Sequence, residues 1–598
     1  MTLQLQSPPV ATPLGRNLPL NADSVAPNLS DLLVAYLELL GVEYVFGVPG
    51  GHISALYEAL HRSQQRGGPR AILSRHETGA AHMAAGYARE TGKLGVCCAT
   101  TGPGASNLIT GLMGAYADNT PVLAITAQSM LNKFGAAALQ ESSPDTIDTT
   151  AMIGHCTLYN SIVTHPKQAE QKIVAALRHA LQPPGGPVHL SIPVDLSRVP
   201  MPGTLAYPQL RESLATPTAF VNLAAVERLW QRLLDTLHKG RQVVIWVGHE
   251  CAGATAAIMR VAELLNAKVI TTQRGKSRVD SYHPLVAGVF GFAGHQSARA
   301  ALTAESVDLV LAAGVSLGQW ATSSWDEALL NDKLVHIHPI NKYFDRTPMA
   351  CLHVHGSVSA VFSELASRLE RWRREHNLPG ATVTHRVAGP EERRGVPAQI
   401  KVREPEFYES SAAPIHPQRL ILEMMRQLPP EARVVTDNCN WLAWSFHHFF
   451  AANHQNFHST GEAVVSMGWA IGAAVGMALA FRGTPVVCLT GDGCFLMNGQ
   501  EITVAVEERL PVIYVILNDG GYGMVKHRHR QVAKQPLEFS FSRVDFARMA
   551  EAMGATGYTI HTIEDLQSLD FAAICRNPGP TVIDVHIDPE ATPPMGMY

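Results

Sequence analysis

The sequence carries little charge of either sign. Charged residues make up 16% of its 598 residues, and 47 lysines and arginines nearly balance 51 aspartates and glutamates. A net charge of −4 provides no excess of basic groups for binding nucleic acid or an anionic membrane surface. Because 46% of the residues are apolar, disordered, collagen-like and coiled-coil proteins are excluded. The chain can bury large cores, and its length predicts roughly three to four domains.

The sequence also lacks metal-binding cysteine motifs and targeting signals. The nine cysteines include no Cys-x-x-Cys pair and no zinc-binding spacing. Cys97, Cys98 and Cys488 lie within apolar runs, as is typical of buried free thiols in a cytosolic protein. No basic region precedes an apolar one near the N-terminus, so we expect no secretory signal. Segment 463–481 is the most apolar, but its many glycines and alanines favour a buried helix over a membrane span. We therefore expect a cytoplasmic protein.

Three blocks of similar length each alternate short apolar strands with helical patterns. This alternation predicts an α/β protein with three consecutive parallel-sheet domains, and their similar size suggests an ancient duplication. We expect a mobile leader at 1–28 and domains at 29–200, 219–372 and 414–598, joined by polar linkers that contain proline. The predicted strands are 44–48, 94–100, 121–126 and 188–192 in the first block, 242–247, 268–272, 307–312 and 334–337 in the second, and 433–437, 485–490, 511–517 and 581–587 in the third.

An amphipathic helix opens the first block. Apolar residues between Leu32 and Leu40 repeat on one helical face. Ser30 is placed to cap the start of this helix, and Gly41 is placed to end it.

Two Asp-Gly turns follow neighbouring apolar strands in the third block. Asp492 comes directly after the strand 485–490, and Asp519 directly after the strand 511–517, with a helical segment between them. Both aspartates should therefore lie at the carboxyl ends of adjacent parallel strands, where α/β sheets bind ligands. Two carboxylates and the carbonyl of Gly521 suit Mg²⁺, and the helix starts after these turns can bind a phosphate. The alternative is a pair of ordinary turns at unrelated strand ends.

The first block holds a second candidate in the segment Arg75-His76-Glu77. Glu77 follows a short apolar strand and opens a helix. Taken alone, it is typical of a first-turn glutamate that the helix dipole stabilises.

Together with other motifs in the same order, these two candidates resemble the thiamine diphosphate enzymes of the acetolactate synthase type. The resemblance covers nearly the whole chain after residue 28. The motifs are 46–51 (Phe-Gly-Val-Pro-Gly-Gly), His76-Glu77 followed by 85–89, 101–107 (Thr-Gly-Pro-Gly-Ala-Ser-Asn), Met467-Gly468, Gly491-Asp492-Gly493 and Gly523-Met524-Val525. The resemblance implies a pyrimidine-binding, a central and a diphosphate-binding domain, with thiamine diphosphate and Mg²⁺ as cofactors.

The resemblance also assigns roles to single residues. It implies that Glu77 hydrogen-bonds the aminopyrimidine ring and so promotes loss of the C2 proton, and that Met467 holds the cofactor bent. Backbone groups of Val465 and Met467 are expected to bond the aminopyrimidine. Asp492, Asp519 and the Gly521 carbonyl match the Mg²⁺ ligands, although the family often has two asparagines where this chain has Asn518-Asp519. The other expected cofactor contacts are Cys439, Asn440, Gly491, Gly493, Cys494 and Met524.

The family chemistry is carboligation of 2-oxo acids. The cofactor attacks a 2-oxo acid, CO₂ is lost, and the enamine left behind adds to a second carbonyl; we expect pyruvate as the donor. Family active sites lie between the first block of one subunit and the third block of another. Glu77 and Asp492 are therefore expected to meet across the interface of a homodimer or tetramer. Gln140 matches a glutamine that faces the reacting carbonyls, and the alternative is a solvated loop amide.

Three departures from the acetolactate synthase pattern bear on cofactor and substrate. Segment 316–320 replaces an arginine-rich stretch, and His338 replaces an acidic residue, so we expect no FAD. Arg528 stands in a basic run where a pocket-shaping tryptophan is usual, and would be either an anchor for a substrate carboxylate or a solvated side chain. His52 stands where a small residue is usual, and would be either a hydrogen-bond donor or acid/base group, or a packed histidine.

These departures leave other functions open. One alternative is a specialised carboligase or lyase for bulkier or aromatic 2-oxo acids in secondary metabolism, of the scytonemin type. A second is a 2-oxo acid decarboxylase, and a third is a cofactor-binding scaffold without activity.

Overall fold

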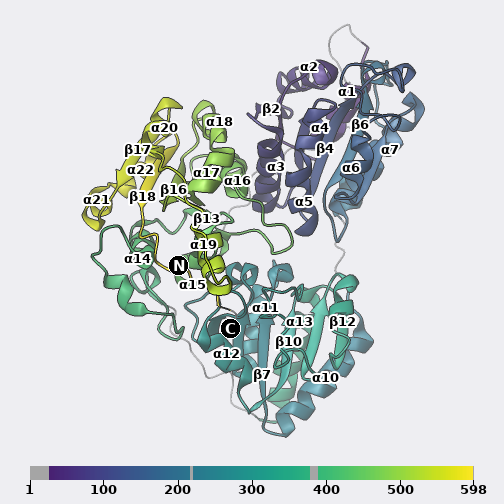
Figure 1. The fold of residues 1–598 in the computed structure, drawn as a ribbon. Coiled ribbons are helices and arrows are strands. Elements are labelled where there is room, and N and C mark those ends of the chain that lie inside the picture. The colour runs from purple at the N-terminus through teal and green to yellow at the C-terminus, as the bar shows by residue number, and fades with distance from the viewer. Residues whose placement is uncertain (1–25, 216–219, 378–387, 597–598) are drawn as a thin grey trace. The chain divides into compact units, whose positions relative to one another are not determined.

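The computed structural model describes residues 26–215, 220–377 and 388–596, and these contain three six-stranded parallel sheets (Figure 1). The α/β fold class with three consecutive parallel-sheet domains is thus confirmed. Each sheet falls within one of the predicted domain ranges. Apart from its last three residues, the predicted leader lies outside the described residues.

The first sheet has the strand order β2-β1-β3-β4-β6-β5, and all neighbours are parallel. Strands β3, β4 and β6 are buried over their whole length, as is typical of inner strands in parallel sheets. The strands are β1 (Tyr44–Gly47), β2 (Arg70–Leu73), β3 (Gly95–Ala99), β4 (Val122–Gln128), β5 (Tyr159–Ile162) and β6 (Val188–Pro193). The α-helices of this part are α1 (Leu29–Leu39), α2 (Ser54–Gln64), α3 (Glu77–Thr91), α4 (Pro103–Asn107), α5 (Ile109–Ala117), α6 (Thr149–Gly154), α7 (Pro166–Leu181), α8 (Val194–Ser197) and α9 (Leu210–Ala215).

Helix α1 begins at a different cap from the predicted one. The Asn28 side chain accepts the Asp31 N–H at 3.1 Å, and the Asp31 carboxylate accepts the Asn28 N–H at 3.0 Å. The prediction that Ser30 caps this helix is therefore wrong. A capping box needs a suitable side chain three positions after the cap, and Ser30 has no acidic residue there. The Ser30 hydroxyl instead donates to the Ser197 carbonyl at 3.1 Å. Gly41 follows the helix with a φ of 71°, as expected for a glycine that ends a helix.

The central sheet has the order β12-β11-β10-β7-β8-β9, with parallel neighbours. Read from β9, this is the doubly wound order in which the third, second and first strands precede the fourth, fifth and sixth. Ligands of such sheets bind at the carboxyl ends of the strands where the order reverses, here β7 and β10. The strands are β7 (Gln242–Val247), β8 (Lys268–Thr271), β9 (Val286–Val289), β10 (Val307–Ala313), β11 (Leu334–His338) and β12 (Leu352–His355). The α-helices are α10 (Leu223–His238), α11 (Thr255–Leu265), α12 (Gln296–Thr303) and α13 (Val358–Glu375).

The third sheet, β14-β13-β15-β16-β18-β17, repeats the topology of the first, again with parallel neighbours. The shared order supports the duplication inferred from block size. The strands are β13 (Arg433–Thr436), β14 (Phe457–His458), β15 (Val486–Gly491), β16 (Val512–Asn518), β17 (Thr556–Ile560) and β18 (Thr581–His586). The α-helices are α14 (Pro417–Gln427), α15 (Asn440–His448), α16 (Trp469–Ala480), α17 (Asp492–Asn498), α18 (Ile502–Glu507), α19 (Gly523–Val532), α20 (Phe546–Ala552), α21 (Ile563–Ser568) and α22 (Phe571–Arg576).

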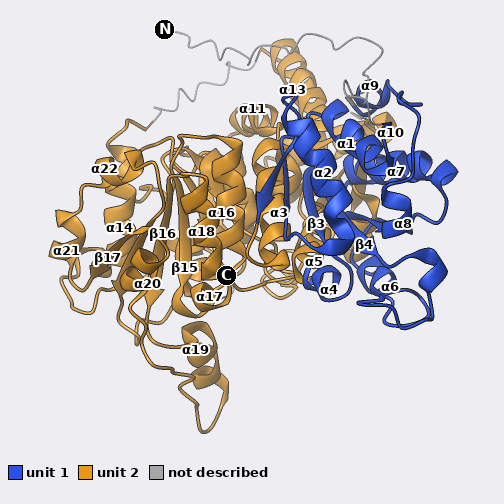
Figure 2. Ribbon diagram, turned by 90° about the horizontal axis from the view of Figure 1, so that it is seen from above, with its two compact units in different colours: residues 1–73, 93–109, 121–216 blue, residues 74–92, 110–120, 217–598 orange. Residues whose placement is uncertain are grey.

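The chain divides into two compact units (Figure 2). Unit 1 comprises residues 1–73, 93–109 and 121–216, and unit 2 comprises residues 74–92, 110–120 and 217–598. Helix α3 therefore belongs to unit 2, where it packs against α16. Their backbones approach closely, because a side chain at Gly86 would collide with the Ala473 carbonyl, and one at Gly476 with the Met83 carbonyl. This packing fixes Glu77, at the start of α3, in the unit that contains the third sheet.

All nine cysteines are free. Seven are buried and Cys439 is partly buried, as expected, but the prediction of a buried thiol is wrong for Cys351, which is exposed beside the edge strand β12. Helix α16 is almost entirely buried, in agreement with the buried helix predicted for that apolar segment. In the described residues, no helix combines the length and the apolar character needed to cross a membrane.

Candidate active site

A cavity of about 230 Å³ lies at the carboxyl ends of β13, β15 and β16. These are adjacent strands of the third sheet, so the cavity is where an α/β sheet is expected to bind its ligand. It brings together every predicted cofactor and metal residue except Glu77. The lining includes Cys439, Asn440, Val465, Met467, Gly491, Asp492, Gly493, Cys494, Asp519, Gly521 and Met524.

Backbone N–H groups hold the Asp492 carboxylate in place. Its Oδ1 accepts the N–H of Gly493 at 2.6 Å, and its Oδ2 accepts the N–H groups of Gly520 at 2.8 Å and Gly521 at 3.3 Å. The turn after β16 therefore lies against the start of α17, which begins at Asp492. The two Asp-Gly turns of the sequence form one site, as the spacing predicted.

Asp519 lies close enough to Asp492 for the two carboxylates to interact. Burial raises the pKa of both carboxyls, and the negative charge of Asp492 raises the pKa of Asp519 further. Asn440 Nδ2 donates to Asp519 Oδ2 at 3.4 Å, while the buried Oδ1 of Asn440 has no hydrogen-bond partner among the described residues. The buried carboxylate of Asp492, the partly buried carboxylate of Asp519 and the unused amide oxygen form an oxygen-rich set that a divalent cation would neutralise.

These residues fit Mg²⁺ with a bound diphosphate. Across the described residues, no group of three or more His, Cys, Asp or Glu side chains converges as a metal site. A cation here would instead combine two carboxylates with backbone or phosphate oxygens, which is the usual arrangement for Mg²⁺. The space is also preserved by glycine, since a side chain at Gly523 would collide with Asp519 and Asn440.

Glu77 is the first residue of α3 and is largely buried. The segment before it is held by Glu501, a fully buried carboxylate that accepts the His76 N–H at 2.9 Å and the Arg75 N–H at 3.2 Å. Burial raises the pKa of Glu501 to about 7, and the charge of Glu77 adds to this effect. Sequence reasoning missed Glu501, although a glutamate next to the apolar run 502–506 was a possible signal.

The loop between β14 and α16 carries Val465 and Met467 to the cavity. Gly461 donates its N–H to both oxygens of Asp118, at 3.1 and 3.2 Å. Arg89 forms an ion pair with Asp118 and donates to the Ser459 carbonyl at 2.8 Å. These side chains, which the sequence did not single out, fix the loop on its approach to the cavity.

Asn438, which follows β13, contacts two residues of this loop. Its amide donates to the Ser466 carbonyl at 2.7 Å and accepts from the Thr460 hydroxyl at 2.6 Å. Asn438 itself lines the cavity, so the loop is tied to the end of β13 directly beside Met467.

The structure does not include His52, Gln140 or Arg528 in the lining of this cavity. His52 is half-buried in a 3₁₀ turn (Gly51–Ile53) of unit 1. Gln140 is exposed in unit 1 with a φ of 53°, and its carbonyl accepts the Thr101 hydroxyl at 3.0 Å. Arg528 is exposed on α19 and donates to Gln531 at 3.3 Å. Their expected substrate roles stay predictions.

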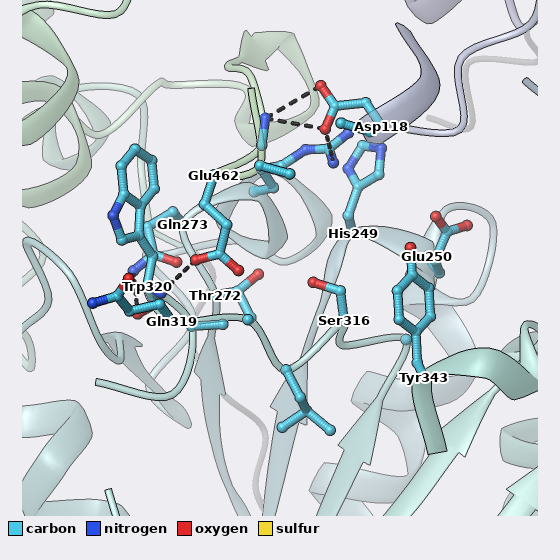
Figure 3. A pocket seen from close by; sticks show the side chains of 18 of the residues that line it. Asp118, His249, Glu250, Thr272, Gln273, Ser316, Gln319, Trp320, Tyr343 and Glu462 are labelled. Carbon is cyan, nitrogen blue, oxygen red and sulfur yellow. Dashed lines mark hydrogen bonds and ion pairs between the residues drawn. The ribbon is translucent and has the colours of Figure 1, made fainter. Parts of the chain in front are cut away.

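A second and larger cavity, of about 390 Å³, lies at the carboxyl ends of β7, β8, β10 and β11 in the central sheet (Figure 3). It is lined by 316–320 and His338, the positions at which flavin binding was expected to be lost. The Trp320 N–H, in the loop after β10, donates to the carboxylate of Glu462. Arg274 and Arg346 line the same cavity, and burial raises the pKa of Glu462. The expectation that the chain binds no FAD stays a prediction.

Comparison with known proteins gives a consistent result. Three family models described as the N-terminal, central and C-terminal domains of thiamine pyrophosphate enzymes match residues 27–152, 230–365 and 438–585. An acetolactate synthase of Arthrospira platensis is 31% identical over 565 residues, which cover 93% of each chain. A probable acetolactate synthase large subunit of Methanocaldococcus jannaschii is 28% identical, over 95% of this chain and 93% of its own.

One solved structure shares the fold. Its title describes a thiamin diphosphate-dependent enzyme from Mycobacterium smegmatis, and it aligns with a TM-score of 0.75 over 94% of this chain and 99% of its own. The sequence identity is 23%, so this likeness supports the fold alone.

Proposed function

Because the chain belongs to the thiamine pyrophosphate enzymes and is similar to acetolactate synthases along nearly its whole length, we propose that it is a Mg²⁺-dependent carboligase of 2-oxo acids. The proposed donor is pyruvate, which loses CO₂ before the remaining two-carbon unit is joined to a second 2-oxo acid. When bound, thiamine diphosphate supplies the nucleophilic carbon and stabilises the negative charge left by CO₂. The protein supplies binding, orientation and proton transfer.

The observation that carries this proposal is the pair of neighbouring carboxylates, the buried Asp492 and the partly buried Asp519, in the cavity of the third sheet. Uncompensated, the pair would be costly in a buried site. With Mg²⁺ bound, both would be ionised and would hold the diphosphate of the cofactor through the metal. The turn glycines keep the backbone close enough to position the two carboxylates.

Glu77 is proposed to exchange a proton with the aminopyrimidine ring. Glu501 accepts the N–H groups of Arg75 and His76, the two residues before Glu77, and so fixes the backbone that leads to Glu77. Such positioning is what acid–base catalysis requires.

We further propose that the active form is a homo-oligomer whose sites lie between subunits. Large apolar side chains surround the cavity and are exposed in the single chain, among them Val465 at 38%, Tyr522 at 39% and Val525 at 51%. Leu496 and Met497, on the helix that starts at Asp492, are also exposed. An apolar surface of this kind is typical of a protein–protein contact. Light scattering on the purified protein would test this, and a monomer that turns over substrate would contradict it.

The test of function is a product analysis. The protein is incubated with thiamine diphosphate, Mg²⁺ and a panel of 2-oxo acids, and the products are identified by mass. We expect a 2-hydroxy-3-oxo acid from pyruvate. Release of the aldehyde alone would identify a decarboxylase, and products from aromatic donors alone would identify the specialised carboligase. Bound cofactor without turnover of any donor would identify a scaffold. Omission of Mg²⁺ is the matched control.

A further inference from the structure

Three arginines of unit 2 line a small cavity of about 90 Å³. Arg89 comes from α3, and Arg274 and Arg278 come from the 3₁₀ turn that follows β8. We name this cavity the arginine cavity. His249 and Arg274 also line the larger cavity of the central sheet, so the two cavities adjoin. The complete lining is Arg89, His249, Arg274, Ser277, Arg278, Phe457, His458 and Ser459.

The charges around the arginine cavity do not balance. Asp118 is paired with Arg89 and, at 2.8 Å, with Arg274. Arg278 has neutral partners, because it donates to the carbonyl and to Nδ1 of His249, both at 3.0 Å. Glu250 is the next carboxyl group, and burial raises its pKa.

A third carboxylate near the cavity is already neutralised. Glu90 contacts His458 at 3.1 Å, but it forms its own ion pair with Arg433. Glu462 in the adjoining cavity interacts with both Arg274 and Arg346. Four guanidinium groups therefore face the three carboxyl groups of Asp118, Glu250 and Glu462. Burial raises the pKa of Glu250 and of Glu462, which lowers the negative charge available to the arginines. A buried positive charge without a partner is costly, and an anion would remove that cost.

Arg274 leaves one complete edge of its guanidinium group unused. Its Nη1 bonds Asp118, whereas its buried Nε and Nη2 have no hydrogen-bond partner among the described residues. Nε and Nη2 form the edge that binds two oxygens of a carboxylate or phosphate in parallel. Buried donors without a partner in a folded protein call for an explanation, and an ordered water or a bound ion would each supply one.

The local field is positive as well. The pKa of His249 is held well below its ordinary value by burial and by the charges of Arg274, Arg278 and Arg89. Burial, opposed by the charge of Asp118, lowers the pKa of Arg89 to about 10. His249 is therefore neutral, and it adds a hydrogen-bonding group without adding charge.

We propose that the arginine cavity binds one small oxyanion, a phosphate or sulfate group, with Arg274, Arg278 and Arg89 as its cationic partners. Two sources share this chemistry. One is free inorganic phosphate. The other is a phosphate monoester whose remaining part enters the larger cavity, beside Tyr343 and Trp320 (Figure 3). Because the arginine cavity measures only about 90 Å³, we limit the proposal to a single phosphate or sulfate group.

The test uses the full chain with saturating thiamine diphosphate and Mg²⁺, so that the phosphate subsite of the cofactor is filled. Inorganic phosphate is titrated by calorimetry and by thermal unfolding, in chloride buffer at constant ionic strength. We expect saturable binding of one phosphate per chain and an unfolding temperature that rises with phosphate concentration. The absence of saturable binding would overturn the proposal. The readout is binding, so it does not depend on whether the proposed function is correct.

Variants locate the site. Arg274→Gln removes the charged edge and should weaken phosphate binding roughly tenfold or more, as should Arg278→Gln. Arg278→Gln leaves the ion pair between Arg274 and Asp118 intact. It can therefore test the site even if Arg274→Gln fails to fold. The matched control is Arg346→Gln, because Arg346 is exposed and lines only the larger cavity. Folded variants that keep the wild-type affinity at both positions would overturn the proposal.

A parallel titration with phenyl phosphate separates the two sources. Tighter binding than inorganic phosphate, weakened by Arg274→Gln, supports the site and identifies a monoester as its ligand. Equal or weaker binding, with the same dependence on Arg274, supports the site and identifies free phosphate. Binding of either probe that Arg274→Gln and Arg278→Gln both leave unchanged would place the anion elsewhere.

Discussion

Glu501 leads to a prediction whose size follows from the structure. Its side chain is fully buried and accepts the N–H groups of Arg75 and His76. Burial raises its pKa from 4.5 to about 7. Between these two values, the folded state binds a proton that the unfolded state releases.

A raised pKa means that folding disfavours the ionised form. The contribution of Glu501 to stability is therefore fully present below about pH 4.5, and it is lost as the pH rises through about 7. The difference between the two pKa values corresponds to about 3 kcal/mol, at ~1.36 kcal/mol per pH unit. About 2 kcal/mol of this loss falls between roughly pH 5.5 and pH 8.5.

Glu501→Gln keeps the shape and cannot ionise. We expect the wild type to lose about 2 kcal/mol of stability relative to this variant from pH 5.5 to pH 8.5, which is a few degrees in Tm. Scanning calorimetry of both proteins at both pH values would measure the change. Glu507→Gln is the matched control, since Glu507 lies at the end of α18 and pairs with Arg75 at 2.5 Å, but is exposed. A difference between wild type and Glu501→Gln that is the same at both pH values would refute the reasoning.

Four further predictions concern the site. Glu77→Gln should lower turnover by about 10²-fold or more, the scale of lost acid–base catalysis, while the cofactor still binds; near-normal turnover would contradict its role. Asp492→Ala should abolish Mg²⁺-dependent cofactor binding, followed by tryptophan quenching, and an unchanged affinity would place the metal elsewhere. The purified protein should show no flavin absorbance, because segment 316–320, in the loop after β10, replaces the usual arginine-rich stretch; release of FAD on denaturation would contradict this. His52→Ala should lower kcat and Arg528→Ala should raise the acceptor KM, and unchanged constants in both variants would remove these residues from the site.

The inner strands of each sheet could be predicted from the sequence, whereas the edge strands were mostly missed. All twelve predicted strands are present, and they occupy the four inner positions of every six-stranded sheet. An inner parallel strand is buried on both faces and reads as a continuous apolar run. Three edge strands lack this signal: β5 is only partly buried at every position, and β12 and β17 each have one buried residue. The edge strand β9 is buried throughout, but its four residues, Val-Ala-Gly-Val, form too short an apolar run to stand out. Of the edge strands, only β2 was predicted, as the short apolar strand before Glu77 and without bounds. It ends at Leu73 rather than directly before Glu77.

In the site, the residues that could be predicted lie in local sequence patterns, and those that were missed have distant partners. The turns at Asp492 and Asp519 were predictable because a carboxylate followed by glycine at the end of an apolar strand is a local pattern. Glu501, Asp118 and Glu462 could not be found in this way. Their partners lie 425, 343 and 142 residues away along the chain, and no pattern in the sequence joins such pairs.

One segment, 459–468, links the central sheet to the cofactor cavity. Asp118 holds its first residues through Gly461, and Glu462 bonds the loop that lines the larger cavity. Met467, a few residues on, lines the cofactor cavity. Arg274, which bonds Asp118, also lines the arginine cavity. An anion that engages Arg274 would therefore act on the same carboxylate that fixes the start of this segment. Through the bond between Trp320 and Glu462, segment 316–320, which departs from the acetolactate synthase pattern, is therefore joined to the segment that places Met467 in the cavity of the third sheet.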